Sequence, residues 1–71
     1  MVTVTPADIG QRVSLRRLLV TGEYSDVVGI LQSWTDGVLV VRRRTDELVE
    51  IEEKILVAGK VVPPAPPRRT R

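Results

Sequence analysis

The sequence predicts a small all-β domain, a five-stranded SH3-like barrel. The pattern of apolar runs and turns indicates this fold class, and the composition limits how the fold can be stabilised. Short runs of β-branched and aliphatic residues alternate with turn signals along the 71-residue chain. The chain contains no Cys, so disulfides and thiolate metal sites are excluded, and without His a zinc site would have to use carboxylates alone. A core of Val, Leu and Ile is therefore the main source of stability, and closing the short sheet into a barrel hides its edges.

The predicted centre of the fold is a hairpin, with strands at residues 27–34 and 38–43. Asp36 and Gly37 lie between the two apolar runs, and Asp-Gly is a strong hairpin signal. Both runs are apolar on both parities, so we expect the first of them to begin buried on both faces. Gly29 predicts a bulge or a sharp bend, as small barrels need in order to close.

The segment before this hairpin predicts a lead-in and one more strand. Residues 1–9 are expected to be irregular, with a turn or one helical turn around Pro6. Residues 11–20 alternate apolar and polar, which indicates a half-buried strand. A helix is the rival, because three leucines also fit helical spacing, but the run is short and bracketed by Gly10 and Gly22. Residues 21–26 are expected to form a polar loop.

After the hairpin, the pattern predicts a turn at residues 44–47 and a strand at residues 48–52. Residues 52–55 lose the strand period and suit one 3-10 turn before a last strand at residues 56–62. Pro63 ends that strand because it has no N–H to donate. The barrel thus spans residues 10–62. An OB-fold usually spends more residues, and an Sm-like barrel, although closer, is expected to begin with a clear helix.

Residues 63–71 form a separate segment rich in proline and arginine. Four prolines within residues 63–67 favour an extended polyproline II spacer. The spacing Pro63-x-x-Pro66-x-Arg68 also fits an SH3 ligand. A linker or tail is the plainer interpretation of this composition.

The net charge of +2 is unevenly distributed. Residues 1–67 hold eight Lys and Arg against nine Asp and Glu, and the other three positive charges are Arg68, Arg69 and Arg71. Nucleic-acid binding usually needs a basic face that contacts several phosphates, so a nearly neutral barrel weakens that expectation. The nucleic-acid alternative would use Arg16, residues 42–44 and the arginine tail.

A candidate interaction surface comprises Tyr24, Trp34, Arg42, Arg43 and Arg44. For the arginines, cross-strand pairing of Arg42 or Arg43 with an acidic residue of the next strand is the plainer account. Glu50 and Glu52 are the expected partners. For Trp34, packing with the indole N–H near the surface is more usual than ligand binding.

No residue pattern predicts a catalytic, cofactor-binding or metal site. His and Cys are absent, no Gly-rich phosphate loop is present, and Asp36 lies in a turn where Asp is favoured for local hydrogen bonding. No run approaches the ~20 apolar residues of a membrane span, and the N-terminus lacks a basic and then apolar leader. We therefore expect a cytoplasmic, non-enzymatic domain with no membrane partner.

Three pieces of the chain together resemble a known family. They are Gly10-x-Arg12-Val13, the stretch from Asp26 to Arg42 with its Trp-x-Asp-Gly hairpin, and Val57-Ala58-Gly59-Lys60-Val61-Val62-Pro63-Pro64. Over about residues 10–69 the chain resembles the SH3-like N-terminal domain of actinobacterial GNAT-type N-acetyltransferases, some labelled histone acetyltransferases.

The resemblance implies an accessory or docking domain whose partner is a GNAT catalytic domain in cis or trans, or a second copy of itself. In such proteins acetyl-CoA is held by an Arg/Gln-x-x-Gly-x-Gly/Ala turn at a helix N-terminus. No position of this chain matches that turn. Acetyl-CoA is therefore implied only for a catalytic domain that this chain does not contain.

Overall fold

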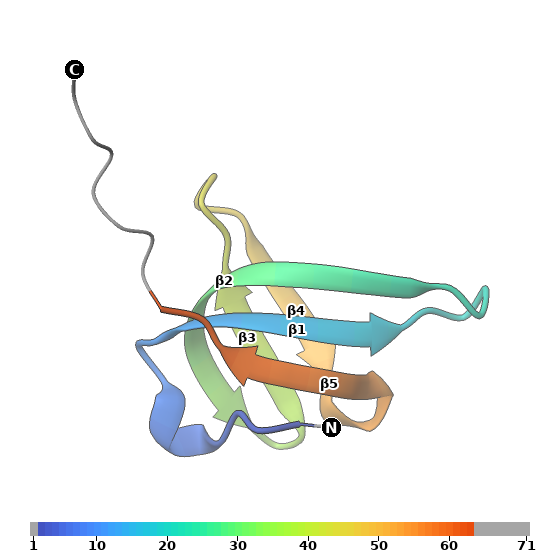
Figure 1. The fold of residues 1–71 in the computed structure, drawn as a ribbon, viewed down its shortest axis with the longest axis horizontal. Coiled ribbons are helices and arrows are strands. Elements are labelled where there is room, and N and C mark those ends of the chain that lie inside the picture. The colour runs from blue at the N-terminus through green and yellow to red at the C-terminus, as the bar shows by residue number, and fades with distance from the viewer. Residues whose placement is uncertain (1, 64–71) are drawn as a thin grey trace.

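The computed structural model describes residues 2–63, which form one antiparallel five-stranded sheet bent into a small barrel (Figure 1). The elements are η1 (Pro6–Asp8), β1 (Arg12–Leu18), β2 (Tyr24–Thr35), β3 (Val38–Arg42), β4 (Leu48–Glu52), η2 (Glu53–Ile55) and β5 (Leu56–Val61). Their order in the sheet is β4-β3-β2-β1-β5. The predicted all-β fold is confirmed, including the 3-10 turn before the last strand. Apart from Pro63, the proline- and arginine-rich tail lies outside the described residues.

Strand β2 is the longest element and holds the two halves of the sheet together. Its first part pairs with β1 and its last part with β3, and the ribbon curves strongly between them (Figure 1). Gly29 lies where the partner changes, and a Cβ there would press on the carbonyl oxygen of Arg42 and lie 2.8 Å from Val41 Cγ1. The break in register lies between Leu31 and Ser33, so the predicted bend involves Gly29 but the bulge follows it.

The core lies on the concave face of this bent sheet. Its buried members are Val4, Val13, Leu15, Val27, Leu31, Leu39, Val41 and Ile51. Val28 alternates with these residues along β2 and is 40% exposed, so the expectation of two-sided burial at the start of this strand is wrong. A single sheet curved around one small core leaves its convex face to solvent, and no second layer covers it within residues 2–63.

Strand β2 also begins earlier than predicted. Tyr24 to Asp26 were expected in a loop, but they continue the ladder, with Tyr24 opposite Leu18 and Asp26 opposite Arg16. The low intrinsic strand preference of Asp26 is overridden by cross-strand pairing with Arg16. Residues 12–18 form a strand and not the rival helix.

The turns agree with their sequence signals. Asp36 and Gly37 both have positive φ, 55° and 76°, as a type I′ hairpin turn requires. Asp46, with φ of 71°, lies in the turn between β3 and β4.

No helix among residues 2–63 is long and apolar enough to cross a membrane.

The lead-in is attached to the barrel at two points. Val2 forms a parallel bridge with Gly59 of β5, and Thr3 donates its backbone N–H and its hydroxyl to the Gly59 carbonyl, at 2.8 and 2.9 Å. Val4 then enters the core with 4% exposure. The predicted helical turn is present as η1, where Asp8 caps Thr5 N–H at 2.9 Å.

Candidate functional site

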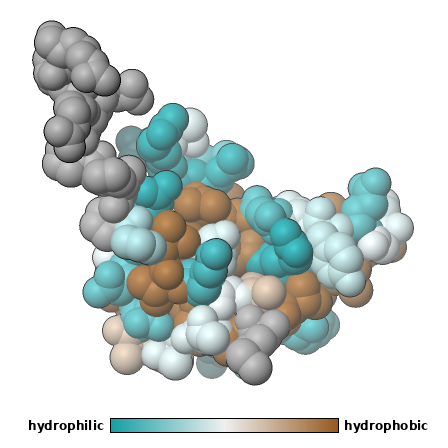
Figure 2. All heavy atoms as spheres, viewed as in Figure 1, coloured by the Kyte–Doolittle hydropathy of each residue, from teal (hydrophilic) through white to brown (hydrophobic). Residues whose placement is uncertain are grey.

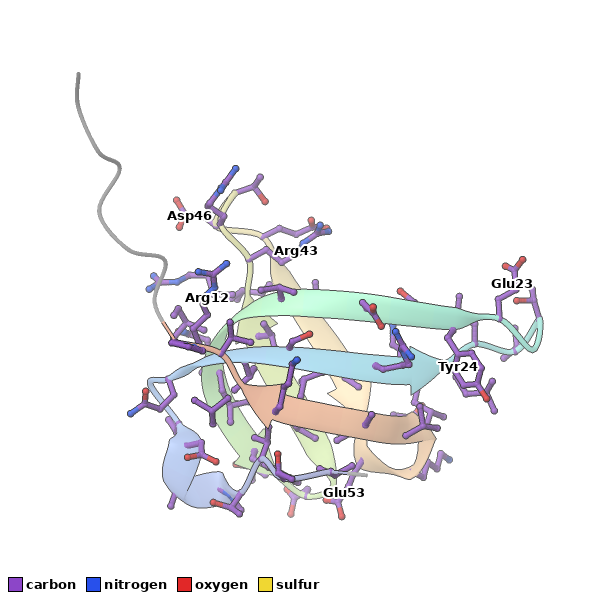
Figure 3. All side chains as sticks on the ribbon, viewed as in Figure 1. Arg12, Glu23, Tyr24, Arg43, Asp46 and Glu53 are labelled. Carbon is purple, nitrogen blue, oxygen red and sulfur yellow. The ribbon has the colours of Figure 1, made fainter. Side chains whose placement is uncertain are left out.

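A groove with arginines around an apolar floor lies on the convex face of the sheet. It is lined by Arg12, Val28, Gly29, Ile30, Arg42, Arg43, Arg44 and Asp46, and we call it the arginine groove. These residues come from β1, β2, the end of β3 and the turn that follows β3. Figure 3 shows Arg12 on one side and Arg43 and Asp46 at the turn.

The register of three adjacent strands builds this groove. Ile30 of β2 lies directly opposite Arg12 of β1 and also directly opposite Arg42 of β3. Directly opposed residues share a face of the sheet, so two arginine side chains flank one isoleucine. Because neighbouring strands are about 4.8 Å apart, the two arginine Cα atoms are separated by roughly 10 Å.

Most of the positive charges of the groove have no acidic partner. The ion pairs that join residues of the 2–63 segment are Arg16–Asp26, Arg43–Glu47 and Lys54–Glu52. Of the four groove arginines, these pairs engage Arg43 alone, and Asp46 is the single carboxylate in the lining. The groove therefore has a positive potential, although the nine acidic residues outnumber the eight basic ones over residues 1–67.

The floor of the groove is apolar. Val28 is 40% exposed and Ile30 is half-buried, and both are continuous with Gly29 along β2. In the face shown in Figure 2, apolar residues gather in a patch bordered by hydrophilic ones. A planar guanidinium can donate two hydrogen bonds to one carboxylate or phosphate. This arrangement suits a ligand that carries anionic groups next to an apolar group.

Arg16 lies on the same face of β1 as Arg12 but has a different environment. Its Nε donates to Asp26 Oδ1 at 2.8 Å and its Nη2 donates to Asp26 Oδ2 at 3.2 Å. These hydrogen bonds, assisted by the attraction between the charges, lower the pKa of Asp26 and raise the pKa of Arg16. Arg16, which the nucleic-acid alternative requires, is therefore already occupied.

Trp34 belongs to a second polar region, at the other end of the β2–β3 hairpin. Its ring packs against the core and its Nε1 donates to Glu53 Oε1 at 2.8 Å. Glu53 N–H donates in turn to the Gly37 carbonyl at 2.8 Å, and Lys54 pairs with Glu52 at 3.3 Å. We call Trp34, Gly37, Glu52, Glu53 and Lys54 the Trp34 corner. The prediction that Trp34 is a packing residue with its N–H near the surface is confirmed.

The predicted interaction residues do not form one surface. Tyr24 is exposed at the start of β2, opposite Leu18, whereas Trp34 lies ten residues further along the same strand, opposite Leu39. The arginines at 42–44 lie apart from both, in the groove.

The predicted cross-strand partners of the arginines are also wrong. Arg42 is opposite Leu48, and the two expected glutamates are opposite Val40 and Val38. Arg43 pairs instead with Glu47, across the turn, at 3.4 Å.

Sequence reasoning missed Arg12, Val28 and Ile30 as members of the candidate site. The alternation in residues 12–16 places Arg12 on the polar face, but only the register shows that this face meets Arg42 across Ile30. The missing information was therefore long-range pairing and not residue type.

The described residues do not fit the cofactor that the resemblance implies for an acetyltransferase. A pyrophosphate is usually held by backbone N–H groups at the start of a helix, and the two helices in residues 2–63 are 3-10 turns of three residues each. The same segment holds no group of three or more His, Cys, Asp or Glu that could bind a metal ion.

Comparison with known protein families identifies a match that covers most of the chain. Residues 1–60 match the family described as the Rv0428c N-terminal Sm-like domain. No curated protein and no solved structure matches the chain. The Sm-like description agrees with the five-stranded barrel, but the expectation that such a barrel begins with a clear helix does not hold, because η1 has three residues.

Proposed function

The chain belongs to the Rv0428c N-terminal Sm-like domain family, and on this premise we propose that it is a non-catalytic docking domain of a GNAT-type N-acetyltransferase. By its description, the family domain is the N-terminal part of a protein. The acetyltransferase context comes from the resemblance over residues 10–69. In this proposal the catalytic domain, in cis or in trans, holds acetyl-CoA, and the barrel acts with it in the cytoplasm.

The observation that carries the proposal is the arginine groove. Three arginines without an ion-pair partner in the described chain surround exposed apolar side chains, and an exposed apolar patch rimmed by polar groups is typical of a protein interaction site. The groove offers four arginines as binding groups, and apart from the Asp46 carboxylate it holds no side chain usual for nucleophilic or general-base chemistry. A docking role requires only the arginines and the apolar side chains that line the groove.

The proposal is tested by separating the two domains of the longer protein. Residues 1–71 and the acetyltransferase domain are produced as separate chains and mixed in a calorimeter, and acetyl-CoA turnover is measured for each chain and for the mixture. We expect association of the two chains and turnover by the catalytic domain alone. Absence of association, or turnover by residues 1–71 alone, contradicts the proposal.

A small nucleic-acid-binding barrel is the second candidate, favoured by the same unpaired arginines. It is weakened by the Arg16–Asp26 pair and by the overall charge of residues 1–67. Titration with single-stranded DNA and RNA at about 50 and about 200 mM salt separates the two functions. Tight binding that falls steeply with salt supports the second candidate, whereas we expect none at the lower salt.

A further inference from the structure

We propose that the arginine groove holds an acidic segment of the domain that follows the barrel in the longer protein. The inference rests on the proposed function and deepens it, because it names the docking surface and the chemistry of its occupant. Carboxylates of that segment bind the groove arginines, while an apolar side chain between them packs on Val28 and Ile30. The groove thereby fixes the orientation of the following domain relative to the barrel.

The position of the groove at the exit of the chain supports this occupant. Val62, directly after β5, donates its N–H to the carbonyl of Arg12 at 2.8 Å. The polypeptide therefore leaves the barrel beside one wall of the groove. A domain tethered there is present at an effective concentration on the order of millimolar, which adds to the affinity that the separate domains have for each other.

The charges of the groove indicate that its occupant is negatively charged. They exclude the segment that follows the barrel directly, residues 64–71, as that occupant. Arg12, Arg42 and Arg44 have no ion-pair partner within residues 2–63. The segment just after the barrel adds three more arginines among residues 68–71, so it has the same sign as the groove. Charge complementarity therefore favours an acidic segment further along the polypeptide.

The apolar floor favours a peptide over a phosphate backbone. Ile30 lies between Arg12 and Arg42, so a ligand that reaches both arginines must cover an isoleucine. A peptide with acidic residues on both sides of an apolar residue can pair with both arginines and cover the isoleucine between them. A phosphate backbone would meet the arginines but leave Val28 and Ile30 without an apolar partner.

The test uses one double variant and one matched control. Association of residues 1–71 with the separately produced following domain is measured for the wild type, for Arg12→Gln with Arg42→Gln, and for Arg16→Gln. Arg16 is on the same face of β1 as Arg12 but is held by Asp26, outside the groove lining. We expect the double variant to weaken association at least about tenfold and the control to leave it within about twofold. Thermal unfolding of each variant shows whether the barrel is intact.

The outcomes separate this inference from the proposed function. If the two domains associate equally in all three forms, the groove inference is overturned while the docking function stands. If the wild-type chains do not associate, the docking function fails, and a direct probe then decides the chemistry of the groove.

That probe is a titration of isotope-labelled residues 1–71, followed by NMR. One ligand is a Glu-Leu-Glu-Leu-Glu peptide, the second is its Gln-Leu-Gln-Leu-Gln counterpart, and the third is a single-stranded oligonucleotide. We expect the acidic peptide alone to shift the amide signals of Arg12, Ile30 and Arg42. Shifts with the oligonucleotide alone, or with none of the three, overturn the inference.

Discussion

The arginine groove and the Trp34 corner lie at opposite ends of the β2–β3 hairpin and use their polar groups differently. In the corner, the indole N–H, the Glu53 carboxylate and the Lys54 ammonium each have a partner within the domain. In the groove, three guanidiniums have none among the described residues. Polar groups that are satisfied internally stabilise the fold, whereas those left without a partner remain available for a ligand. The comparison therefore predicts that the corner contributes to stability, and it supports the proposed binding role of the groove.

The largest expected effect comes from removing the ring on which the corner depends. Trp34→Ala deletes a half-buried indole that packs on the core, and we expect a loss of about 2–4 kcal/mol in the free energy of unfolding, somewhat below the value for a fully buried Trp. Urea denaturation measures it. Trp34→Phe is the control, because it keeps an apolar aromatic ring while it removes the hydrogen bond and only part of the ring volume. Equal stability of Trp34→Ala and wild type would show that the corner is not structural.

The next largest effect tests how closely the backbone of the groove floor packs against strand β3. Gly29→Ala places a Cβ against the backbone of Arg42 and the side chain of Val41, and we expect a cost of about 1–3 kcal/mol in urea denaturation. The control is Val28→Ala, one residue away and 40% exposed, where we expect under about 1 kcal/mol. If Gly29→Ala lowers the free energy of unfolding less than Val28→Ala does, the backbone at Gly29 can shift to accommodate a side chain.

A smaller effect isolates the hydrogen bond of the corner. Glu53→Ala removes the acceptor of the Trp34 N–H, and we expect a loss of about 1 kcal/mol because the site is exposed to solvent. Glu53→Gln keeps an oxygen acceptor and should restore most of the stability. If the two variants are equally destabilised, the charge of Glu53 matters more than its hydrogen bond.

The smallest effect concerns the paired arginine beside the groove and is visible only as a pH dependence. Hydrogen bonds from Arg16 lower the pKa of Asp26 in the folded state. The pair therefore stabilises the fold above the ordinary Asp pKa, and this contribution is lost as the pH falls through the lower, folded-state value. Asp26→Asn should flatten the acid limb of the stability profile, measured by thermal unfolding at decreasing pH. If stability falls with decreasing pH in the same way in Asp26→Asn and in the wild type, the Arg16–Asp26 pair does not contribute to acid stability.

Much of the fold could be predicted because short apolar runs end at strong turn residues. Strand β4, Leu48–Glu52, has the predicted bounds, and the last strand differs by one residue at its end. The early start of β2 could not be predicted, because Tyr24 to Asp26 are polar or exposed and are held in the strand by partners on β1.

The candidate site was less predictable because it depends on register. The connection between β3 and β4 is five residues long, and this length places Arg42 opposite Leu48 and away from the glutamates expected to neutralise it. In the same way, Arg12 joins the site only through its pairing with Ile30. The three adjacent arginines are visible in the sequence, but whether each has a partner is decided by the strand register and by the geometry of the turn that follows β3.

The attachment of residues 2–5 to β5 has a practical consequence for handling the domain. A truncated variant that begins at Gly10 would lose Val4 from the core and would uncover the Gly59 carbonyl that Thr3 now occupies. Unpaired backbone groups on an edge strand can pair with a strand of another molecule. Such a variant should therefore aggregate at concentrations where the intact chain stays monomeric. Affinity tags are therefore better placed after Pro63 than close to Val2.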